Sequence, residues 1–235
     1  IGLILNYLNK VVLYMKKILS IFFVTIIVSS ILCSNFYVSA EQILPGVKTN
    51  VSLMGTTQND NADRSSWIEG TVDIVNQMGY KALGTPNVSR SSAFSNLKNS
   101  KIWAIHAHGN KTGVRFDYSN SWISYDDIAN LSSNALSNEK VVIFGTCNAG
   151  EGGASAKNMV NITYNKGANV VIGFKSTTYT SQINRWMYEF FVGCKDGKNV
   201  REACEHADYW TKFYHLGFDG GTGNRLLRGG GGLTL

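Results

Sequence analysis

The chain has 235 residues, of which 44% are hydrophobic and 16% charged, and it contains only two prolines. This composition excludes a disordered or collagen-like chain and fits one main globular domain. The formal net charge is +6, but Lys10, Lys16 and Lys17 lie in the first 40 residues, which hold no acidic residue, so the remainder carries +3. That remainder has no cluster of basic and aromatic residues, and we expect no binding to nucleic acid.

The first 40 residues have the three parts of an export signal. Two lysines follow the first methionine, Met15, residues 18–32 are mostly apolar, and residues 38–40 (VSA) form a small-x-small cleavage site. We expect a signal peptide over 15–40, with residues 1–14 as an upstream extension. The mature protein is then secreted or held at the cell surface, with no membrane segment after cleavage. An uncleaved membrane anchor is the alternative.

Strand and helix patterns alternate along the rest of the chain, which predicts an α/β protein with a mainly parallel sheet. The expected strands cover residues 51–55, 81–83, 102–106, 141–146 and 168–174. The expected helices cover residues 66–78, 91–97, 124–136 and 154–165, followed by a long helical pattern with Ile183, Met187, Phe190 and Phe191 on one face. Ser66 and Glu69 have the spacing of a capping box, which predicts that Ser66 caps the first helix.

Two segments depart from this alternation. Residues 110–122 are polar and aromatic and predict a small hairpin. Residues 217–235 are rich in glycine, but no strand precedes them and no helix follows, so they do not fit a phosphate-binding loop. We interpret 217–235 as a flexible C-terminal tail, or a chain cut short, and residues 41–216 as the folded domain.

Two of the predicted strands end in reactive side chains. Residues 102–109 (IWAIHAHG) lead to His108, and residues 141–147 (VVIFGTC) lead to Cys147. In open α/β sheets the chemistry lies outside the carboxyl ends of the parallel strands, so these ends predict a Cys/His nucleophilic site. Backbone N–H groups of Gly109 and Cys147 would form its oxyanion hole. The alternative is that both side chains only pack in the core.

A second histidine, His106, precedes His108 by two residues and is expected on the same face of the strand. His106, His108 and Cys147 would give zinc three ligands with no evident fourth, so we expect no metal and no cofactor. Beyond residue 40 the chain has three cysteines, an odd number that leaves at least one thiol free. Cys194 and Cys204 form a disulfide or pack as small core residues, and their close spacing favours packing.

The order His108-Gly109 followed 39 residues later by Cys147 resembles the caspase-like cysteine peptidases of clan CD. Residues 167–173, 185–191 and 197–203 resemble the strand, the aromatic helix and the Gly-x-x-Val-x-x-Ala helix of CHAT domains. The resemblance covers residues 51–207 and is closest to the CHAT and clostripain–gingipain-like group of secreted bacterial type. It implies a caspase-like three-layer α-β-α sandwich around a mainly parallel central sheet.

The same resemblance implies a secreted cysteine endopeptidase that acts on a protein or peptide. Cys147 would attack the scissile carbonyl to form an acyl-enzyme, and His108 would protonate the leaving amine. Some relatives pair through a sheet edge, which implies a possible homodimer. The alternative function is a non-catalytic, caspase-like binding module outside the cell, because a fold does not dictate a function.

The position two residues before the nucleophile carries Asp or Gln in some relatives, but here it is Gly145. Their preference for the residue before the cut, P1, therefore does not transfer. The loop after the first strand commonly contributes to the S1 pocket in the family, and here it offers Asp60, Asp63 and Arg64. An aspartate there would favour a basic P1 residue and Arg64 an acidic one. The alternative is that all three are solvated loop charges.

Overall fold

The computed structural model describes residues 51–56, 62–116 and 121–235. The predicted upstream extension, the predicted signal peptide and Asp60 lie outside these ranges. Within them, no helix is long and apolar enough to cross a membrane.

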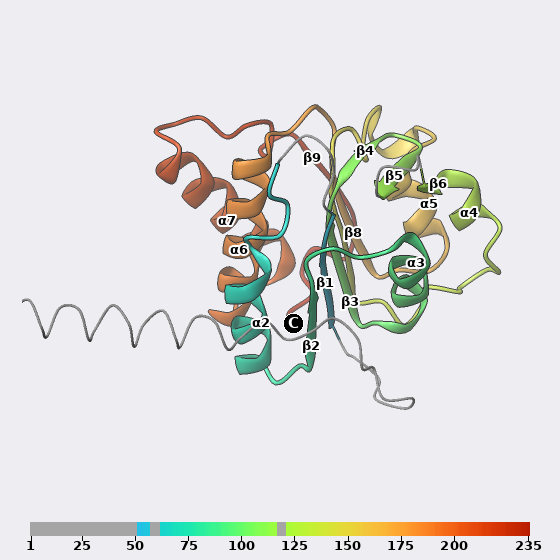
Figure 1. The fold of residues 1–235 in the computed structure, drawn as a ribbon, viewed down its shortest axis with the longest axis horizontal. Coiled ribbons are helices and arrows are strands. Elements are labelled where there is room, and N and C mark those ends of the chain that lie inside the picture. Colours follow the sequence, from blue (N-terminus) through green and yellow to red (C-terminus); the bar gives the residue numbers. More distant parts are fainter. Residues whose placement is uncertain (1–50, 57–61, 117–120) are drawn as a thin grey trace, which may run out of the picture. The chain divides into compact units, whose positions relative to one another are not determined.

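A six-stranded sheet forms the centre of the domain (Figure 1). Its strands, in spatial order, are β2 (Ala82–Thr85), β1 (Val51–Gly55), β3 (Ile102–His106), β7 (Val141–Gly145), β8 (Val170–Phe174) and β9 (Arg225–Gly229). The first five are parallel to one another, and β9 runs antiparallel to β8 at the edge. These pairings confirm the mainly parallel sheet expected from the sequence. Its buried strands are short runs of β-branched and aromatic residues bounded by polar segments, the pattern typical of such strands.

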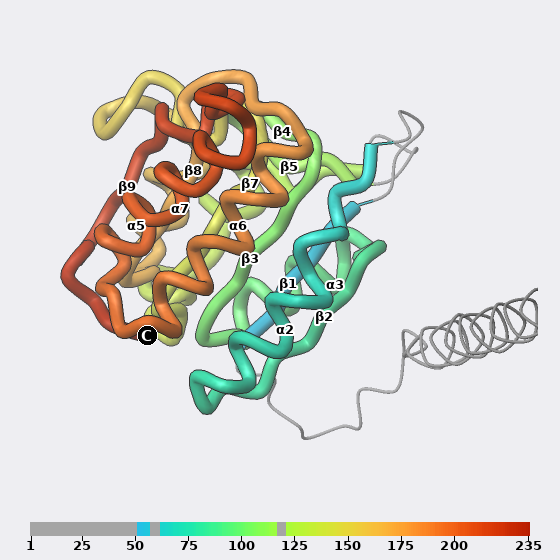
Figure 2. Tube along the Cα trace, turned by 90° about the vertical axis from the view of Figure 1, so that its left-hand side faces the viewer, coloured from blue at the N-terminus to red at the C-terminus, as the bar shows by residue number. Residues whose placement is uncertain are grey.

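Helices cover both faces of this sheet and complete three layers (Figure 1). One face carries α2 (Ile68–Gln77), α6 (Thr180–Lys195) and α7 (Val200–Tyr214), which lie side by side in Figure 2. The other carries α3 (Arg90–Asn99), α4 (Tyr125–Ala129), the short helix η1 (Gly153–Ser155) and α5 (Met159–Asn165). A small antiparallel sheet of β4 (His108–Asn110), β5 (Gly113–Phe116) and β6 (Ser121–Ser124) lies on this second side. The predicted hairpin at 110–122 is thus part of a three-stranded sheet that begins at His108.

Two hydrophobic cores lie on the two faces of the sheet, because successive strand residues point to opposite sides. Ile102 and Ala104 of β3 face α2, α6 and α7, whereas Trp103 and Ile105 face the other side. The predicted apolar face of the long helical pattern is confirmed, since all four of its residues are fully buried. The parallel strands β1, β3, β7 and β8 are thus packed on both faces, and the chain segments that follow β3 and β7 emerge at the carboxyl edge of this buried sheet.

The two cysteines of α6 and α7 belong to the first of these cores. Cys194 and Cys204 are buried free thiols, so they pack rather than form a disulfide. Gly193 allows this close approach of the two helices, because a Cβ on it would lie 3.1 Å from the Ala203 Cα.

The glycine-rich segment 217–235, interpreted as a tail, is instead part of the domain. Its residues 225–229 form β9, and Leu233 O accepts a hydrogen bond from Val200 N at the start of α7. Gly229 makes the edge pairing possible: its φ is +95°, and a Cβ there would lie 1.9 Å from Asn169 O. The sequence pattern concealed this strand because Arg and Gly flank only two apolar residues.

The predicted capping box at Ser66 is also wrong. The helix begins at Ile68, its N-cap residue is Trp67, and no side chain caps it. The Ser66 hydroxyl accepts a hydrogen bond from Asn184 Nδ2 of α6 instead. The Ser66 hydroxyl oxygen, which the local pattern predicted as the cap of the helix, therefore makes a tertiary hydrogen bond instead.

Candidate active site

The pairing of β3 with β7 brings the His108 segment beside Cys147. His106 lies opposite Gly145 in the parallel register, and Ala107 N donates to Gly145 O at 3.4 Å. Just beyond this pairing, Gly109 packs on Thr146 so closely that an added Cβ would lie 2.8 Å from the Thr146 Cβ. Only glycine permits this approach. The structure thus brings together the two segments that carry the predicted nucleophile and proton carrier.

Cys147 is half-buried, and its sulfur is held by the loop that leads into α6. Thr178 N donates to Sγ at 3.4 Å, and the Thr178 Oγ1 lies 3.6 Å from the same sulfur. The next residue, Asn148, has φ +58°, a left-handed conformation that turns the chain sharply away from β7. Sequence reasoning did not single out Thr178, although its place just after a parallel strand was a usable signal.

His108 contacts the guanidinium of Arg64, which lies in the loop after β1. Arg64 Nη2 is 2.7 Å from His108 Nε2, and Arg64 is only 3% exposed. Because a guanidinium can only donate, Nε2 accepts this bond and the ring carries its proton on Nδ1. The structure therefore places Arg64, predicted to bind substrate, directly on the predicted proton carrier.

Asp63, the neighbouring candidate for substrate binding, is exposed and serves the local turn. Its Oδ1 accepts from Ser65 N and Ser65 Oγ, both at 2.8 Å, and from Ser66 N at 3.1 Å. Partial burial alone would raise the pKa of Asp63, but these hydrogen bonds outweigh it and lower the pKa below its ordinary value. Its charge is thus satisfied mainly by the turn.

His106 supports the site from behind. It is 3% exposed, and burial lowers its pKa to about 3, so the ring is neutral and Nδ1–H donates to Asn184 Oδ1 at 2.7 Å. Asn184 Nδ2 then donates to Asp63 O at 2.7 Å. Asn184, which sequence reasoning missed, therefore ties α6, the end of β3 and the loop that carries Arg64 together.

The part of the chain that the structure describes contains no group of three or more His, Cys, Asp or Glu residues able to hold a metal ion. His106 is committed to Asn184, and His108 to Arg64. The chemistry that this arrangement offers is that of a thiol, an imidazole and backbone N–H groups at one sheet edge.

No protein-family model and no curated protein matches this sequence. Solved structures do match its fold. The Arg-specific cysteine proteinase gingipain R aligns with a TM-score of 0.63 and 12% identity, over 80% of this chain and 48% of that one. The complex of the pro- and mature domains of Porphyromonas gingivalis RgpB gives 0.61 and 13%, over 80% and 48%. The Saccharomyces cerevisiae separase–securin complex gives 0.52 and 13%, over 78% and 12%.

These similarities define the fold of the chain. It is the caspase-like α-β-α sandwich, the fold of the clan CD cysteine proteases gingipain R and separase, as the sequence predicted. The chain spans about half the length of the gingipain chains it matches and a smaller share of separase.

Proposed function

We propose that this protein is a cysteine endopeptidase whose catalytic residues are His108 and Cys147. The observation that carries the proposal is the β3–β7 register, which sets the His108-Gly109 segment against Thr146-Cys147 at the carboxyl edge of a caspase-like sheet. That edge is where α/β sheets hold their chemistry. The fold neighbours that are cysteine proteases support the same reaction class.

In this mechanism Cys147 loses its proton to His108, and Sγ attacks the carbonyl carbon of the scissile bond. The backbone N–H groups of Gly109 and Cys147 stabilise the resulting oxyanion. The tetrahedral intermediate collapses when the leaving amine takes the proton from His108, which leaves an acyl-enzyme that water hydrolyses.

The contact between Arg64 and His108 supports a preference for an acidic P1 residue. His108 cannot receive a proton on Nε2 while that nitrogen accepts from Arg64. A carboxylate in the substrate is a stronger acceptor for a guanidinium than a neutral imidazole is. An acidic side chain before the cut would therefore draw Arg64 away and free His108. The Arg specificity of gingipain R is the opposite outcome.

Cleavage of a fluorogenic peptide library that varies only at P1 tests both statements. We expect the unmodified chain to turn over Asp or Glu peptides under reducing conditions, and Cys147→Ala and His108→Ala to lose more than a thousandfold of kcat. Cys204→Ala, which removes a buried thiol in α7, is the matched control and should keep the activity. Arg64→Gln should abolish the acidic preference, and a preference for Arg or Lys at P1 would contradict the assignment of Arg64.

The non-catalytic binding module predicts a different result from the same assay. A folded chain without turnover on any peptide, in which Cys147 also fails to react with a peptide-like alkylating agent, would replace the peptidase by this second function. Fold neighbours at 12–13% identity share the fold with this chain, and a shared fold is compatible with either function.

We also propose that the protein is exported and acts outside the cytoplasm, on the pattern of residues 15–40. N-terminal sequencing of the protein from the culture medium is expected to begin at Glu41. Recovery of the chain only in the cytoplasm, with residues 15–40 attached, would contradict export.

A further inference from the structure

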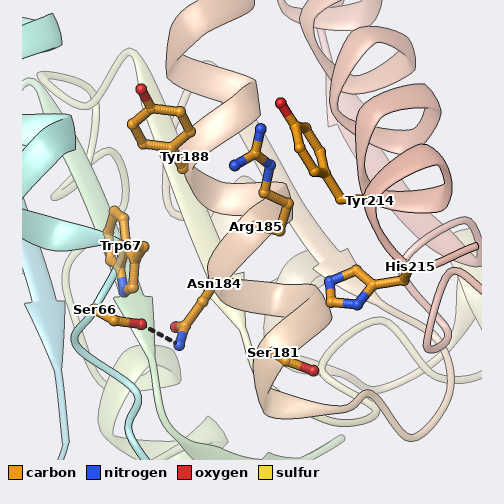
Figure 3. A pocket seen from close by; sticks show the side chains of 8 residues that line it. All are labelled: Ser66, Trp67, Ser181, Asn184, Arg185, Tyr188, Tyr214 and His215. Carbon is orange, nitrogen blue, oxygen red and sulfur yellow. Dashed lines mark hydrogen bonds between the residues drawn. The ribbon is translucent and has the colours of Figure 1, made fainter.

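A pocket of about 370 Å³ lies beside the proposed active site, between the segment just before α2, the helix α6 and the C-terminal end of α7 (Figure 3). Its lining residues are Ser66, Trp67, Ser181, Asn184, Arg185, Tyr188, Tyr214 and His215. Its volume is within the range of ligand-binding sites. His108 and Cys147 are not among its lining residues, so the pocket is a separate feature at the same end of the sheet.

The side chains of the pocket combine one strong cation with aromatic walls. The Arg185 guanidinium lies between two tyrosines, 3.4 Å from the ring centroid of Tyr214 and 5.5 Å from that of Tyr188 (Figure 3). The stacked rings hold the guanidinium in place. Its Nη2 is already paired with Glu189, so Nη1, which has no hydrogen bond to the described residues, is the group left to bind a carboxylate. Trp67 adds a third ring.

Among the residues that the structure describes, no acidic side chain lines the pocket. The nearest described carboxylate on α6, Glu189, is buried and is shared between Arg185 and His206 on the side of α7. Glu189 engages only the Nη2 of Arg185, so the rest of this guanidinium can still donate charge-assisted hydrogen bonds to an anion. Aromatic walls favour a ligand that also carries a flat apolar group.

The pocket and the proposed active site share a wall. Trp67 Nε1 donates to Arg64 O at 3.1 Å, and the side chain of Arg64 contacts His108. Asn184, another lining residue, donates to Asp63 O and accepts from His106. A ligand in the pocket would thus touch the residues that position the loop around Arg64.

We propose that this pocket is a secondary substrate site that binds an acidic residue next to an aromatic residue of the peptide substrate, away from the scissile bond. The assignment to substrate rests on the proposed peptidase function. The binding chemistry itself, a carboxylate on Arg185 and a ring against Tyr188 and Tyr214, stands on the pocket alone.

Binding is tested first, with the full chain carrying Cys147→Ala so that no cleavage interferes. The probes are N-acetyl-Tyr-Glu-amide and N-acetyl-Tyr-Gln-amide, which differ by one charge. We expect the Glu peptide to bind at least tenfold more tightly and to shift the indole N–H resonance of Trp67, identified with Trp67→Phe. Equal binding of the two peptides, or binding without a shift at Trp67, would overturn the proposal.

Two variants locate the binding. Arg185→Gln should remove the advantage of the Glu peptide, and Arg185→Lys should keep part of it. Arg185 also pairs with Glu189, so Tyr214→Ala, at a position 53% exposed, provides a variant with little risk to folding. Its matched control is Tyr209→Ala, on the same helix and 62% exposed but outside the pocket. Equal loss of binding in the two tyrosine variants would place the ligand elsewhere.

Turnover then tests the link to substrate. In peptides with a fixed P1 residue, Glu in place of Gln at one distal position should lower KM about fivefold with little change in kcat, and Arg185→Gln should erase this difference. Binding by the Cys147→Ala chain without turnover by the unmodified chain would refute the peptidase and keep the pocket. Turnover with no effect of Glu at any distal position would refute the pocket as a substrate site and keep the peptidase.

Discussion

Asn184 supports two separate parts of the proposed site with one amide group. Its Oδ1 accepts from His106, and its Nδ2 donates to Asp63 O and Ser66 Oγ. We expect Asn184→Ala to lower the free energy of unfolding by about 2 kcal/mol, because the buried N–H of His106 loses its acceptor. Urea denaturation measures this loss.

Asn99→Ala is the matched control for that variant, because Asn99 is exposed at the end of α3 and bonds only its own helix at Ser95 O. It should change the stability by less than about 0.5 kcal/mol. An equal loss in both variants would show that the amide of Asn184 has no special role.

Glu139 is a second residue with a large single effect, at the opposite end of the sheet from Cys147. It is 1% exposed, and burial raises its pKa to about 9, although the charge of Lys101 opposes the shift. The native state therefore holds a proton that the unfolded state releases above its ordinary pKa of 4.5. This contribution to stability is complete below pH 4.5 and is lost as pH rises toward 9.

Glu139→Gln removes this titration. We expect the free energy of unfolding of the variant, relative to that of the unmodified chain, to increase by about 1 kcal/mol for each pH unit between 5 and 8. Urea denaturation at pH 5, 6.5 and 8 measures the difference, with the exposed Glu205→Gln as control. A constant difference across that range would show that Glu139 is ionised in the folded protein.

Features of the candidate site that lie within one short segment could be predicted from the sequence, whereas contacts between residues far apart in the sequence could not. His108, Gly109 and Cys147 follow from strand ends, because an apolar run that stops at a reactive residue is visible locally. The contact of Arg64 with His108 joins residues 44 apart, and the bond of Asn184 to His106 joins residues 78 apart. No periodicity encodes such pairs, which only the assembled layers create.

At the scale of elements, burial explains which predictions succeeded. The strands fully buried between two layers of helices have continuous apolar sequences, and four were predicted within two residues at each end. The helix expected at 124–136 ends at Ala129, and the chain beyond it forms turns that include Asn134 at φ +63°. The edge strand β9 has no such apolar run, because an edge strand contacts fewer core residues.

The role of β9 gives a prediction at this scale. Gly229→Ala should lower the free energy of unfolding by about 3 kcal/mol, because the new Cβ meets Asn169 O and φ is positive. Gly230→Ala is the matched control, since nothing lies within 4 Å of a Cβ there. Thermal unfolding of both variants measures the contrast, and an unchanged midpoint for Gly229→Ala would mean that the segment is a tail after all.

At the scale of the molecule, the two cores share one sheet, so neither can be lost without the other. The face covered by α2, α6 and α7 forms one cluster that runs from Val51 of β1 to Ala207 of α7. The parallel strands β1, β3, β7 and β8 each contribute residues to both clusters. Loss of one helical layer exposes an entire face of the sheet, so we expect the described domain to unfold as one cooperative unit.

The three cysteines of the described residues report on this cooperativity. Cys147 is half-buried at the sheet edge, whereas Cys194 and Cys204 are 2% and 0% exposed. Burial raises the pKa of Cys204 to about 12 and that of Cys194 well above its usual range, so both thiols stay protonated in the native state. Because the thiolate is the reactive form, both burial and the raised pKa slow the reaction of these two thiols with an alkylating agent.

We therefore expect iodoacetamide to label Cys147 at least a thousandfold faster than Cys194 or Cys204 in the native protein, as measured by peptide mapping. In rising urea the two buried thiols should become reactive together, at the midpoint seen by far-ultraviolet circular dichroism. The Cys147→Ala chain controls for labelling at the site. Early labelling of Cys204 alone would show that α7 opens before the sheet unfolds, and cooperativity of the whole domain would then be wrong.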